Sequence, residues 1–444
     1  MSSASYPVHD SGIFRNLPTF DKSLTGLTAI ITGASGISGF GTLRVLLESP
    51  QRWTKIFTLS RKPIPDTMLS LLSHDERSRI EHVSVDLMSS PSEIASRLKA
   101  SHVAAQYVFF YSYLQPKPPK GARAWSNADE LVKVNAALLS NFLDALPEAG
   151  IKPRRILHQT GAKNYGVHLG RHRTPACESD PQPKHLQPNF YYPQEELLFK
   201  YCKQHPETSW NLIHPGWIVG AVSTAQINGF HPFAVYAAVC AHKGEPMQFP
   251  GDWSTWQFEV HPTTAILTGY LSEWAILEDK CKNERFNAQD TSPMSWDRFW
   301  HECARWFGVK SGVRGPEEDD QKYSSIPVPG GADSPMGYGP PSTHRASFSF
   351  QDWARKPENQ SAWKEMMAKS GGKITNNPFE DIEANFEMGD AILLSIATMN
   401  MSKARRMGWT GYVDSIEAIF LMFEENTRLG LLPSLVVDAA RPLV

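Results

Sequence analysis

Three glycines stand at three-residue steps near the start of the chain, at Gly33, Gly36 and Gly39. A short apolar run ending at Thr32 precedes them, and a helical apolar pattern follows over residues 43–47. Glycine lets the backbone turn sharply and approach a ligand closely, and a helix N-terminus presents free N–H groups to an anion. The spacing, a variant of the commoner Gly-x-Gly-x-x-Gly fingerprint, therefore indicates a strand, turn and helix that bind the pyrophosphate of a dinucleotide. A purely structural turn is the alternative.

A second strand is expected at residues 55–60, and it ends in Ser60, Arg61 and Lys62 rather than in an acidic residue. An acid at this place accepts hydrogen bonds from the ribose 2′-hydroxyl of NAD(H), whereas an arginine binds the 2′-phosphate of NADP(H). These residues therefore favour NADP(H). The alternative is a pair of solvated surface cations.

The Tyr-x-x-x-Lys pair of a short-chain dehydrogenase, in which the lysine lowers the tyrosine's pKa, is absent from its usual place. Tyr165 is followed four positions later by Leu169. Tyr113 and Lys117 have the spacing, but Pro116 lies between them and breaks the helical register. The chemistry must therefore come from other residues.

Two other groups stand in the same part of the chain. Lys163 lies in the loop after the strand expected at 155–159, and Tyr191 and Tyr192 precede a helix expected to run to Gln204. A lysine beside a tyrosine hydroxyl could stabilise negative charge on a substrate oxygen. A buried tyrosine at a helix start is the structural alternative.

The elements that would carry these residues alternate between strands and helices. Apolar runs predict strands at 28–32, 55–60, 80–87, 107–111, 155–159 and 210–220, and an amphipathic pattern predicts a helix over 127–146. Such alternation is typical of right-handed crossovers in a doubly wound sheet. We predict an α/β fold with a Rossmann-type doubly wound parallel sheet and a mostly helical C-terminal substrate lobe.

The expected organisation follows from this pattern. It comprises an N-terminal arm at 1–24, an NADP-binding core at 25–230, a substrate-binding lobe with strands returning to the core at 231–434, and a tail at 435–444. Within the lobe, residues 324–341 are rich in Pro, Gly and Ser and predict a long surface loop, an insertion relative to the family named below. Residues 383–428 predict two helices separated at 408–411.

Composition excludes several classes of protein. The chain of 444 residues has 44 Lys and Arg against 46 Asp and Glu, with no basic block, so a nucleic-acid surface is not expected. Its five cysteines form no Cys-x-x-Cys pair, which argues for a reducing compartment. His168 and His172 lack an acidic partner at ligand spacing, so no metal is expected. The longest apolar run, 233–241, is too short to span a membrane. We expect a cytoplasmic protein that binds a small molecule, with a homodimer left open.

Several motifs resemble those of the progesterone 5β-reductase and iridoid synthase group, an offshoot of the extended short-chain dehydrogenases. They are Thr160-Gly161-x-Lys163-x-Tyr165, Asn189-Phe190-Tyr191-Tyr192, Pro215-Gly216, residues 235–244, residues 283–287, Trp296-x-x-Phe299-Trp300 and residues 430–433. The resemblance implies that Lys163 and Tyr191 are catalytic. Three departures are Asn164, where the family has His, the absence of the Gly-Pro that closes the same motif, and Glu195-Glu196, where the family has Glu-Asp.

The resemblance implies an enone or enal reductase that uses NADPH, in specialised metabolism. Hydride would reach the β-carbon of an α,β-unsaturated carbonyl, while Tyr191 stabilises the enolate and Lys163 holds the ribose and biases the phenol toward its anion. Three alternatives stay open: an NADP-dependent carbonyl reductase, an isomerase or cyclase on the same scaffold, and a non-catalytic NADP-binding regulator.

These expectations define two sets of residues. The cofactor is expected at Thr32, Gly33, Ser35, Gly36, Ile37, Gly39, Ser60, Arg61, Lys62, Asp86, Leu87, Tyr111, Gln159, Thr160, Pro215, Ile218 and Val219. The substrate pocket is expected at Tyr113, Tyr192, Trp253, Ser395 and Met399.

The cation at the end of the second strand gives a first prediction. Arg61→Ala should raise the dissociation constant of NADPH by roughly tenfold or more, the scale for losing one charge-assisted hydrogen bond. The constant for NADH should hardly change, because NADH has no 2′-phosphate. Titrations of both nucleotides test this, and equally tight binding of NADH and NADPH by the wild type would contradict it.

Overall fold

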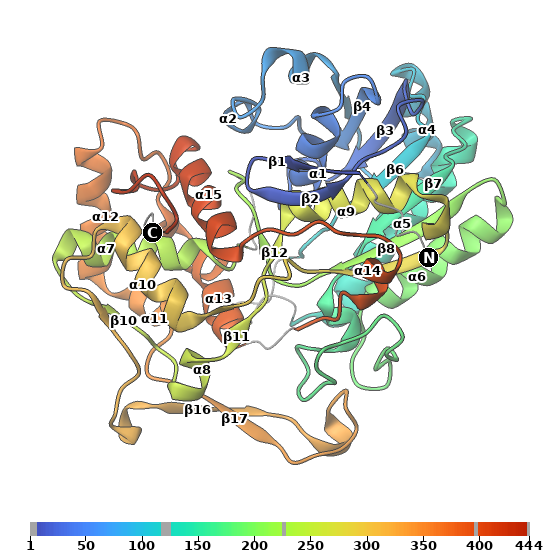
Figure 1. Ribbon diagram of the computed structural model, residues 1–444. Helices are drawn as coiled ribbons and strands as arrows, with labels where there is room; N and C mark the ends of the chain where they lie inside the picture. Colours follow the sequence, from blue (N-terminus) through green and yellow to red (C-terminus); the bar gives the residue numbers. More distant parts are fainter. Residues whose placement is uncertain (1–6, 117–125, 224–227, 395–397, 442–444) are drawn as a thin grey trace.

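A seven-stranded parallel sheet forms the centre of the molecule in the computed structural model (Figure 1). The structure describes residues 7–116, 126–223, 228–394 and 398–441. Across the sheet the strands are β13 (Glu284–Ala288), β8 (Ser209–Pro215), β7 (Arg155–Gln159), β6 (Tyr107–Phe110), β3 (Leu27–Thr32), β4 (Trp53–Ser60) and β5 (Ile80–Ser84). Every neighbouring pair is parallel. The predicted fold class is confirmed.

The strand order reverses between β3 and β6, because β4 and β5 follow β3 on one side and β6, β7 and β8 continue on the other. In open α/β sheets, ligands bind at such a switch point, beyond the carboxyl ends of the strands. Two predicted strands are shorter than expected. β5 ends at Ser84, and the run 210–220 breaks after Pro215, so that Ile218–Val219 form a separate strand, β9.

Alternate residues of β3 enter two different hydrophobic cores. Ala29 and Ile31 pack with α1 (Ile37–Leu47) and α9 (Ala265–Leu277). Ile30 packs on the other face with α4 (Pro91–Ala100), α5 (Ala128–Glu148) and α6 (Tyr191–Gln204). Burial on both faces explains why the strands are apolar runs without alternation.

Helices α1 and α9 cross at glycine. A Cβ on Gly41 would lie 2.8 Å from the backbone carbonyl carbon of Ala265, and a Cβ on Gly269 would lie 3.0 Å from the Cα of Thr42. The two backbones are therefore in direct contact. This contact sets the position of α1, and thus of the glycine turn that precedes it.

A helical lobe lies beside the sheet, on the left of Figure 1. Its helices are α7 (His231–Lys243), α10 (Trp296–Phe307), α11 (Phe350–Arg355), α12 (Pro357–Lys369), α13 (Ile382–Leu393) and α15 (Ser415–Arg428). Phe233 is fully buried among the rings of Trp296, Phe299, Trp300 and Phe350. Most of the aromatic residues of this part of the chain therefore serve the core.

Three segments differ from the sequence-based expectation. Residues 383–428 contain three helices, since α14 (Ser402–Arg406) lies between α13 and α15. The stretch 324–341, expected as an irregular loop, begins with β16 (Ser324–Val328), which pairs antiparallel with β17 (Ser342–Ala346). The arm also forms a hairpin, from β1 (Val8–Ser11) and β2 (Phe14–Pro18).

Long-range packing explains why the N-terminal arm forms the β1–β2 hairpin. Phe14 and Leu17 are buried in the core around α9, although their segment has no clear hydrophobic period. Arg15 also forms a backbone bridge with Tyr412.

The remaining elements are short. They are α2 (Asp66–Leu69), α3 (His74–Ser78), β10 (Met247–Gln248), α8 (Trp253–Trp256), β11 (Glu259–Val260), β12 (Thr263–Thr264), β14 (Met294–Ser295) and β15 (Val313–Arg314). Among the helices in the described ranges, none has the length and apolar character needed to cross a bilayer.

The contact between α1 and α9 gives a second prediction. Gly41→Val should lower the free energy of unfolding by about 2 kcal/mol or more, because the added side chain overlaps the backbone of α9. Ser96→Val, on the exposed face of α4, is the matched control and should cost much less. Urea unfolding measures both, and equal losses would show that the crossing tolerates a side chain.

Candidate active site

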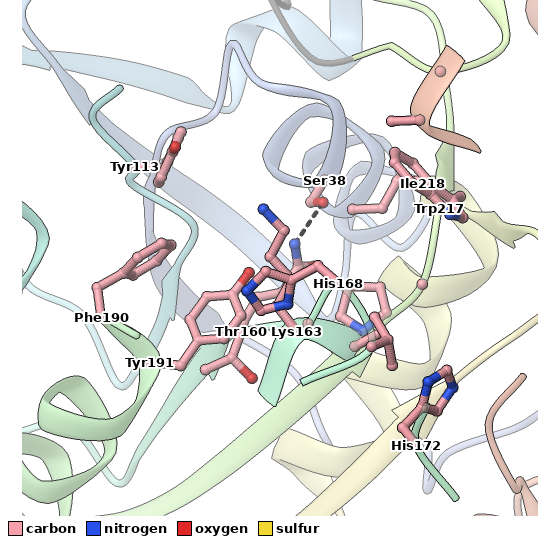
Figure 2. Close-up of a pocket in the computed structure, with 18 of the residues that line it drawn as sticks. Ser38, Tyr113, Thr160, Lys163, His168, His172, Phe190, Tyr191, Trp217 and Ile218 are labelled. Carbon is pink, nitrogen blue, oxygen red and sulfur yellow. Dashed lines mark hydrogen bonds between the residues drawn. The ribbon is translucent and has the colours of Figure 1, made fainter. Parts of the chain in front are cut away.

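A cavity of about 860 Å³ lies beyond the carboxyl ends of the strands. The turn after β3, the segments after β6, β7 and β8, the start of α6 and the end of α13 line it, together with the β16–β17 hairpin. Figure 2 shows Tyr191, Lys163 and His168 gathered in its middle, with Tyr113 and Phe190 on one side and Trp217 and Ile218 on the other. The cavity therefore lies at the switch point of the sheet.

The glycine turn forms one end of the cavity. Gly33 has φ of +70°, and a Cβ on it would lie 2.9 Å from the backbone of Tyr111. A Cβ on Gly39 would lie 2.3 Å from the carbonyl oxygen of Gly33. Gly36 caps α1 without a side chain, so the first N–H groups of the helix face the cavity beside Ile37. These features fit the pyrophosphate of a dinucleotide.

Lys163 and Tyr191 come from two separate elements that Asn189 joins. Lys163 lies in a 3₁₀-helix, Ala162–Tyr165, directly after β7, and Tyr191 begins α6. The side-chain amide of Asn189 donates to the carbonyl oxygen of Lys163 at 2.9 Å, and its oxygen accepts from the N–H of Tyr191 at 3.0 Å. The side chains of Lys163 and Tyr191 both line the cavity. The predicted pair is therefore brought together.

Burial favours the neutral forms of both Tyr191 and Lys163. It raises the pKa of Tyr191 above its ordinary value, so the hydroxyl keeps its proton at neutral pH. Burial also lowers the pKa of Lys163 well below its ordinary value, and the carboxylate of Glu387 opposes this effect. The site is thus arranged around a neutral phenol that can donate a hydrogen bond.

A buried polar network supports this part of the site. Gln182 donates to the side chain of Asn164 at 2.8 Å and to Glu195 at 3.0 Å, and Arg285 lies 3.3 Å from Glu195. Asn164 departs from the family motif, and Glu195 directly precedes a second departure, at Glu196. The network therefore gives the side-chain oxygen of Asn164 a donor beside Lys163.

A family model described as a PRISE-like Rossmann-fold domain matches residues 29–329. The chain belongs to this family. The resemblance found in the motifs is thereby confirmed.

Curated relatives agree. A short chain dehydrogenase of Penicillium aethiopicum, gsfE, is 28% identical over 91% of this chain and 99% of its own length. The 3-oxo-Delta(4,5)-steroid 5-beta-reductase of Arabidopsis thaliana is 28% identical over 64% of this chain and 69% of its own. An (S)-8-oxocitronellyl enol synthase of Nepeta racemosa is 28% identical over 64% and 70%. The chain is accordingly an oxidoreductase of the short-chain dehydrogenase/reductase type.

Among solved structures, the terminal R domain of the myxalamid PKS-NRPS pathway covers 92% of this chain and 93% of its own, with a TM-score of 0.57 and 12% identity. The Bordetella bronchiseptica enzyme WbmG, solved with NAD, covers 92% and 96%, with a TM-score of 0.53 and 11% identity. At these identities the likeness shows the shared fold.

In this PRISE-like chain, the cavity collects most of the expected cofactor residues. Those that line it are Gly33, Ser35, Gly36, Ile37, Gly39, Tyr111, Gln159, Thr160, Pro215 and Ile218. Several are held in place from behind: Gln159 donates to Ser38 at 2.8 Å, and Tyr111 and Thr42 share a hydrogen bond of 2.7 Å. The positions of these side chains are therefore set before any ligand binds.

Other expected cofactor residues lie outside the lining. They are Thr32, Ser60, Arg61, Lys62, Asp86, Leu87 and Val219. The buried hydroxyl of Thr32 accepts from the N–H groups of Tyr111 and Ser112 and so has a structural role. Arg61 and Lys62 are exposed directly after β4, where a 2′-phosphate could reach them from the turn.

The expected substrate residues are dispersed. Tyr113 lines the cavity, but Tyr192 is buried and its hydroxyl donates to the carbonyl oxygen of Asn164. Trp253 is 56% exposed on α8, and Met399 is buried in a small separate cluster with Ala162 and Tyr165, so neither lines the cavity. Ser395 and Lys117 lie outside the described residues.

Sequence reasoning missed one wall of the cavity. It comprises Val167, His168, Gly170, Arg171, His172, Ile326, Pro327, Val328, Pro329, Ser342 and His344. The two histidines after Lys163 were a signal, but only as candidate metal ligands. The hairpin residues carried no signal, because their Pro- and Gly-rich sequence is typical of a loop.

The buried lysine gives a third prediction. Lys163→Met should raise the free energy of unfolding at about pH 7 by about 1 kcal/mol or more, the equivalent of one pKa unit. At neutral pH the unfolded chain carries a charged lysine that the folded protein disfavours. The gain should shrink as the pH approaches the unfolded value of about 10.4, where both states become neutral.

Denaturant titrations at about pH 7 and at about pH 10 measure this effect. The exposed Lys62→Met is the matched control and should show no such pH dependence. A gain for Lys163→Met that does not change with pH would show that the lysine stays charged in the folded protein.

Proposed function

We propose that the protein reduces the carbon–carbon double bond of an α,β-unsaturated carbonyl compound with NADPH. The observation that carries this proposal is the pairing of Tyr191 with Lys163 in the same cavity as the glycine turn. Two relatives named as a steroid 5-beta-reductase and an enol synthase support it. The names of relatives do not establish the reaction of this chain, so the proposal rests on the arrangement of residues in the cavity.

The residues of the turn fit a dinucleotide. Gly33 and Gly39 leave room for close approach of the backbone, and the free N-terminus of α1 favours the pyrophosphate. Arg61 and Lys62 would hold the 2′-phosphate that distinguishes NADPH from NADH. When bound, the cofactor supplies the hydride.

Tyr191 would act at the carbonyl oxygen. Negative charge accumulates on this oxygen as hydride adds to the β-carbon, and a positioned donor stabilises it most in the transition state. Because burial raises the pKa of Tyr191, its hydroxyl carries the proton that this hydrogen bond needs. Lys163, with its carbonyl held by Asn189, would bind the ribose hydroxyls and adjust the acidity of the phenol.

Aromatic rings form an apolar wall of the site. The ring of Phe190 lies 4.5 Å from that of Tyr191 and 5.5 Å from that of Tyr113. A planar conjugated enone could lie against such a wall, with its carbonyl toward the hydroxyl of Tyr191. The same wall would exclude water, which strengthens the hydrogen bond to the developing enolate.

The two adjacent tyrosines give a fourth prediction. Tyr191→Phe should lower kcat on a weakly activated enone by on the order of 10² or more, the scale for losing one donor to a developing oxyanion. NADPH binding and folding should be unchanged, because among the described residues no hydrogen bond joins the side chain of Tyr191 to the glycine turn. Tyr192→Phe is the matched control, and its effect should be milder since Tyr192 does not line the cavity and its hydroxyl donates to the backbone of Asn164.

NADPH absorbance with and without enone measures turnover, and analysis of the product distinguishes a saturated ketone from an allylic alcohol. Equal rates for wild type and Tyr191→Phe on every substrate reduced would remove Tyr191 from the mechanism. An allylic alcohol as the product would assign the chain to carbonyl reduction instead.

A further inference from the structure

The β16–β17 hairpin closes the cavity at the side formed by the loop after Lys163. Figure 1 shows it at the bottom of the molecule, reaching from the helical lobe toward the core. Ile326, Val328 and Pro329 of its first strand and turn line the cavity, as does His344 of the second strand. The hairpin is thus a wall of the cavity as well as a surface feature.

Arg171 fastens the hairpin to the loop. Its N–H donates to the carbonyl oxygen of Pro329 at 3.0 Å, and its carbonyl oxygen accepts from the N–H of Met336 at 2.8 Å. The guanidinium Nε donates to the carbonyl oxygen of Pro340 at 2.6 Å. Backbone and side chain are therefore both held, and the half-buried Arg171 lines the cavity in a defined position.

The remaining nitrogens of this guanidinium are available. Within the described part of the chain, no carboxylate forms an ion pair with Arg171, and its two terminal nitrogens donate to no acceptor. A planar guanidinium fixed through Nε presents its other donors in the fork geometry that matches a carboxylate. Because the arginine is positioned in advance, binding such a group would cost little conformational entropy.

Arg171 supplies the positive charge of the surrounding wall, because burial lowers the pKa of Lys163, His158 and His168 and favours their neutral forms. Lys163 and Arg171 line the cavity together with four histidines, His158, His168, His172 and His344. No Asp or Glu occurs among the lining residues that the structure describes. The carboxylate of Glu387 lies outside the lining and acts on Lys163, so an anion at this wall would be held chiefly by Arg171.

We propose that the substrate carries a carboxylate in addition to its enone, and that Arg171 binds this carboxylate with its terminal guanidinium nitrogens. The proposal rests on the proposed function, because it assumes that the enone lies at Tyr191 in the same cavity. The carboxylate then sets the orientation of the substrate from the hairpin side. The hairpin supplies the apolar surroundings and the backbone acceptors that hold Arg171.

A pair of probes that differ in charge and by a single methyl group tests this proposal. They are para-carboxybenzylideneacetone and its methyl ester, assayed with NADPH for kcat/KM. Binding is measured separately by calorimetry, with the protein saturated with NADP⁺ so that no hydride is available. The variants are Arg171→Met, which removes the charge, and Arg171→Lys, which keeps the charge but loses the fork.

The matched control is Arg173→Met, two residues along the same loop, because Arg173 is exposed and does not line the cavity. The acid-to-ester ratio of kcat/KM should fall at least about tenfold in Arg171→Met, the scale for a charged hydrogen bond. It should fall less in Arg171→Lys and remain at the wild-type value in Arg173→Met. Using the ratio removes any loss caused by partial unfolding of the hairpin.

Each outcome decides one of the two proposals. A wild type that does not prefer the acid, or an Arg171→Met variant that weakens acid and ester equally, would overturn the carboxylate site and leave Arg171 as a clamp for the hairpin. Weaker NADPH binding in Arg171→Met would also overturn it, by assigning the arginine to the cofactor. If neither probe is reduced but calorimetry still shows acid binding that depends on Arg171, the reductase proposal fails while the carboxylate site stands.

Discussion

The contact between the backbones of α1 and α9 is the constraint on which the cofactor end of the site depends. Gly41 and Gly269 allow these helices to touch, and Gly33 and Gly39 then allow the chain to turn tightly between β3 and α1. Any larger side chain at these positions would displace the N-terminus of α1. The anion-binding groups of the helix can therefore face the cavity only because no Cβ atoms stand in the way.

Lys163 and Tyr191, the two groups proposed to act in the reaction, obey a different constraint, which is desolvation. They belong to two consecutive elements, the 3₁₀-helix Ala162–Tyr165 and α6, and the side chain of Asn189 joins them. Burial shifts the pKa of each group toward its neutral form. A neutral phenol in a water-poor cavity is a strong donor to a developing oxyanion, so one physical cause provides both the protonation state and the strength of the interaction.

The wall opposite the glycine turn is assembled differently. It consists of a hairpin that is held to the loop after Lys163 through the backbone and side chain of Arg171. The glycine turn belongs to the sheet and to α1, whereas the hairpin lies outside the sheet and reaches the cavity from the side of the helical lobe. The two ends of the cavity are therefore positioned by different parts of the fold.

The sequence by itself determined the features that depend on local backbone chemistry and on burial of whole strands. The glycine spacing predicted the turn after β3, apolar runs predicted six of the seven strands of the sheet, and the family motifs predicted that Lys163 and Tyr191 share a site. It did not reveal the β16–β17 hairpin, the burial of Phe14 and Leu17, or the separation of Trp253 and Met399 from the cavity. Those features depend on contacts between segments distant in the chain, and no local pattern of residues records such contacts. Only the tertiary structure therefore decided which residues complete the wall around Arg171.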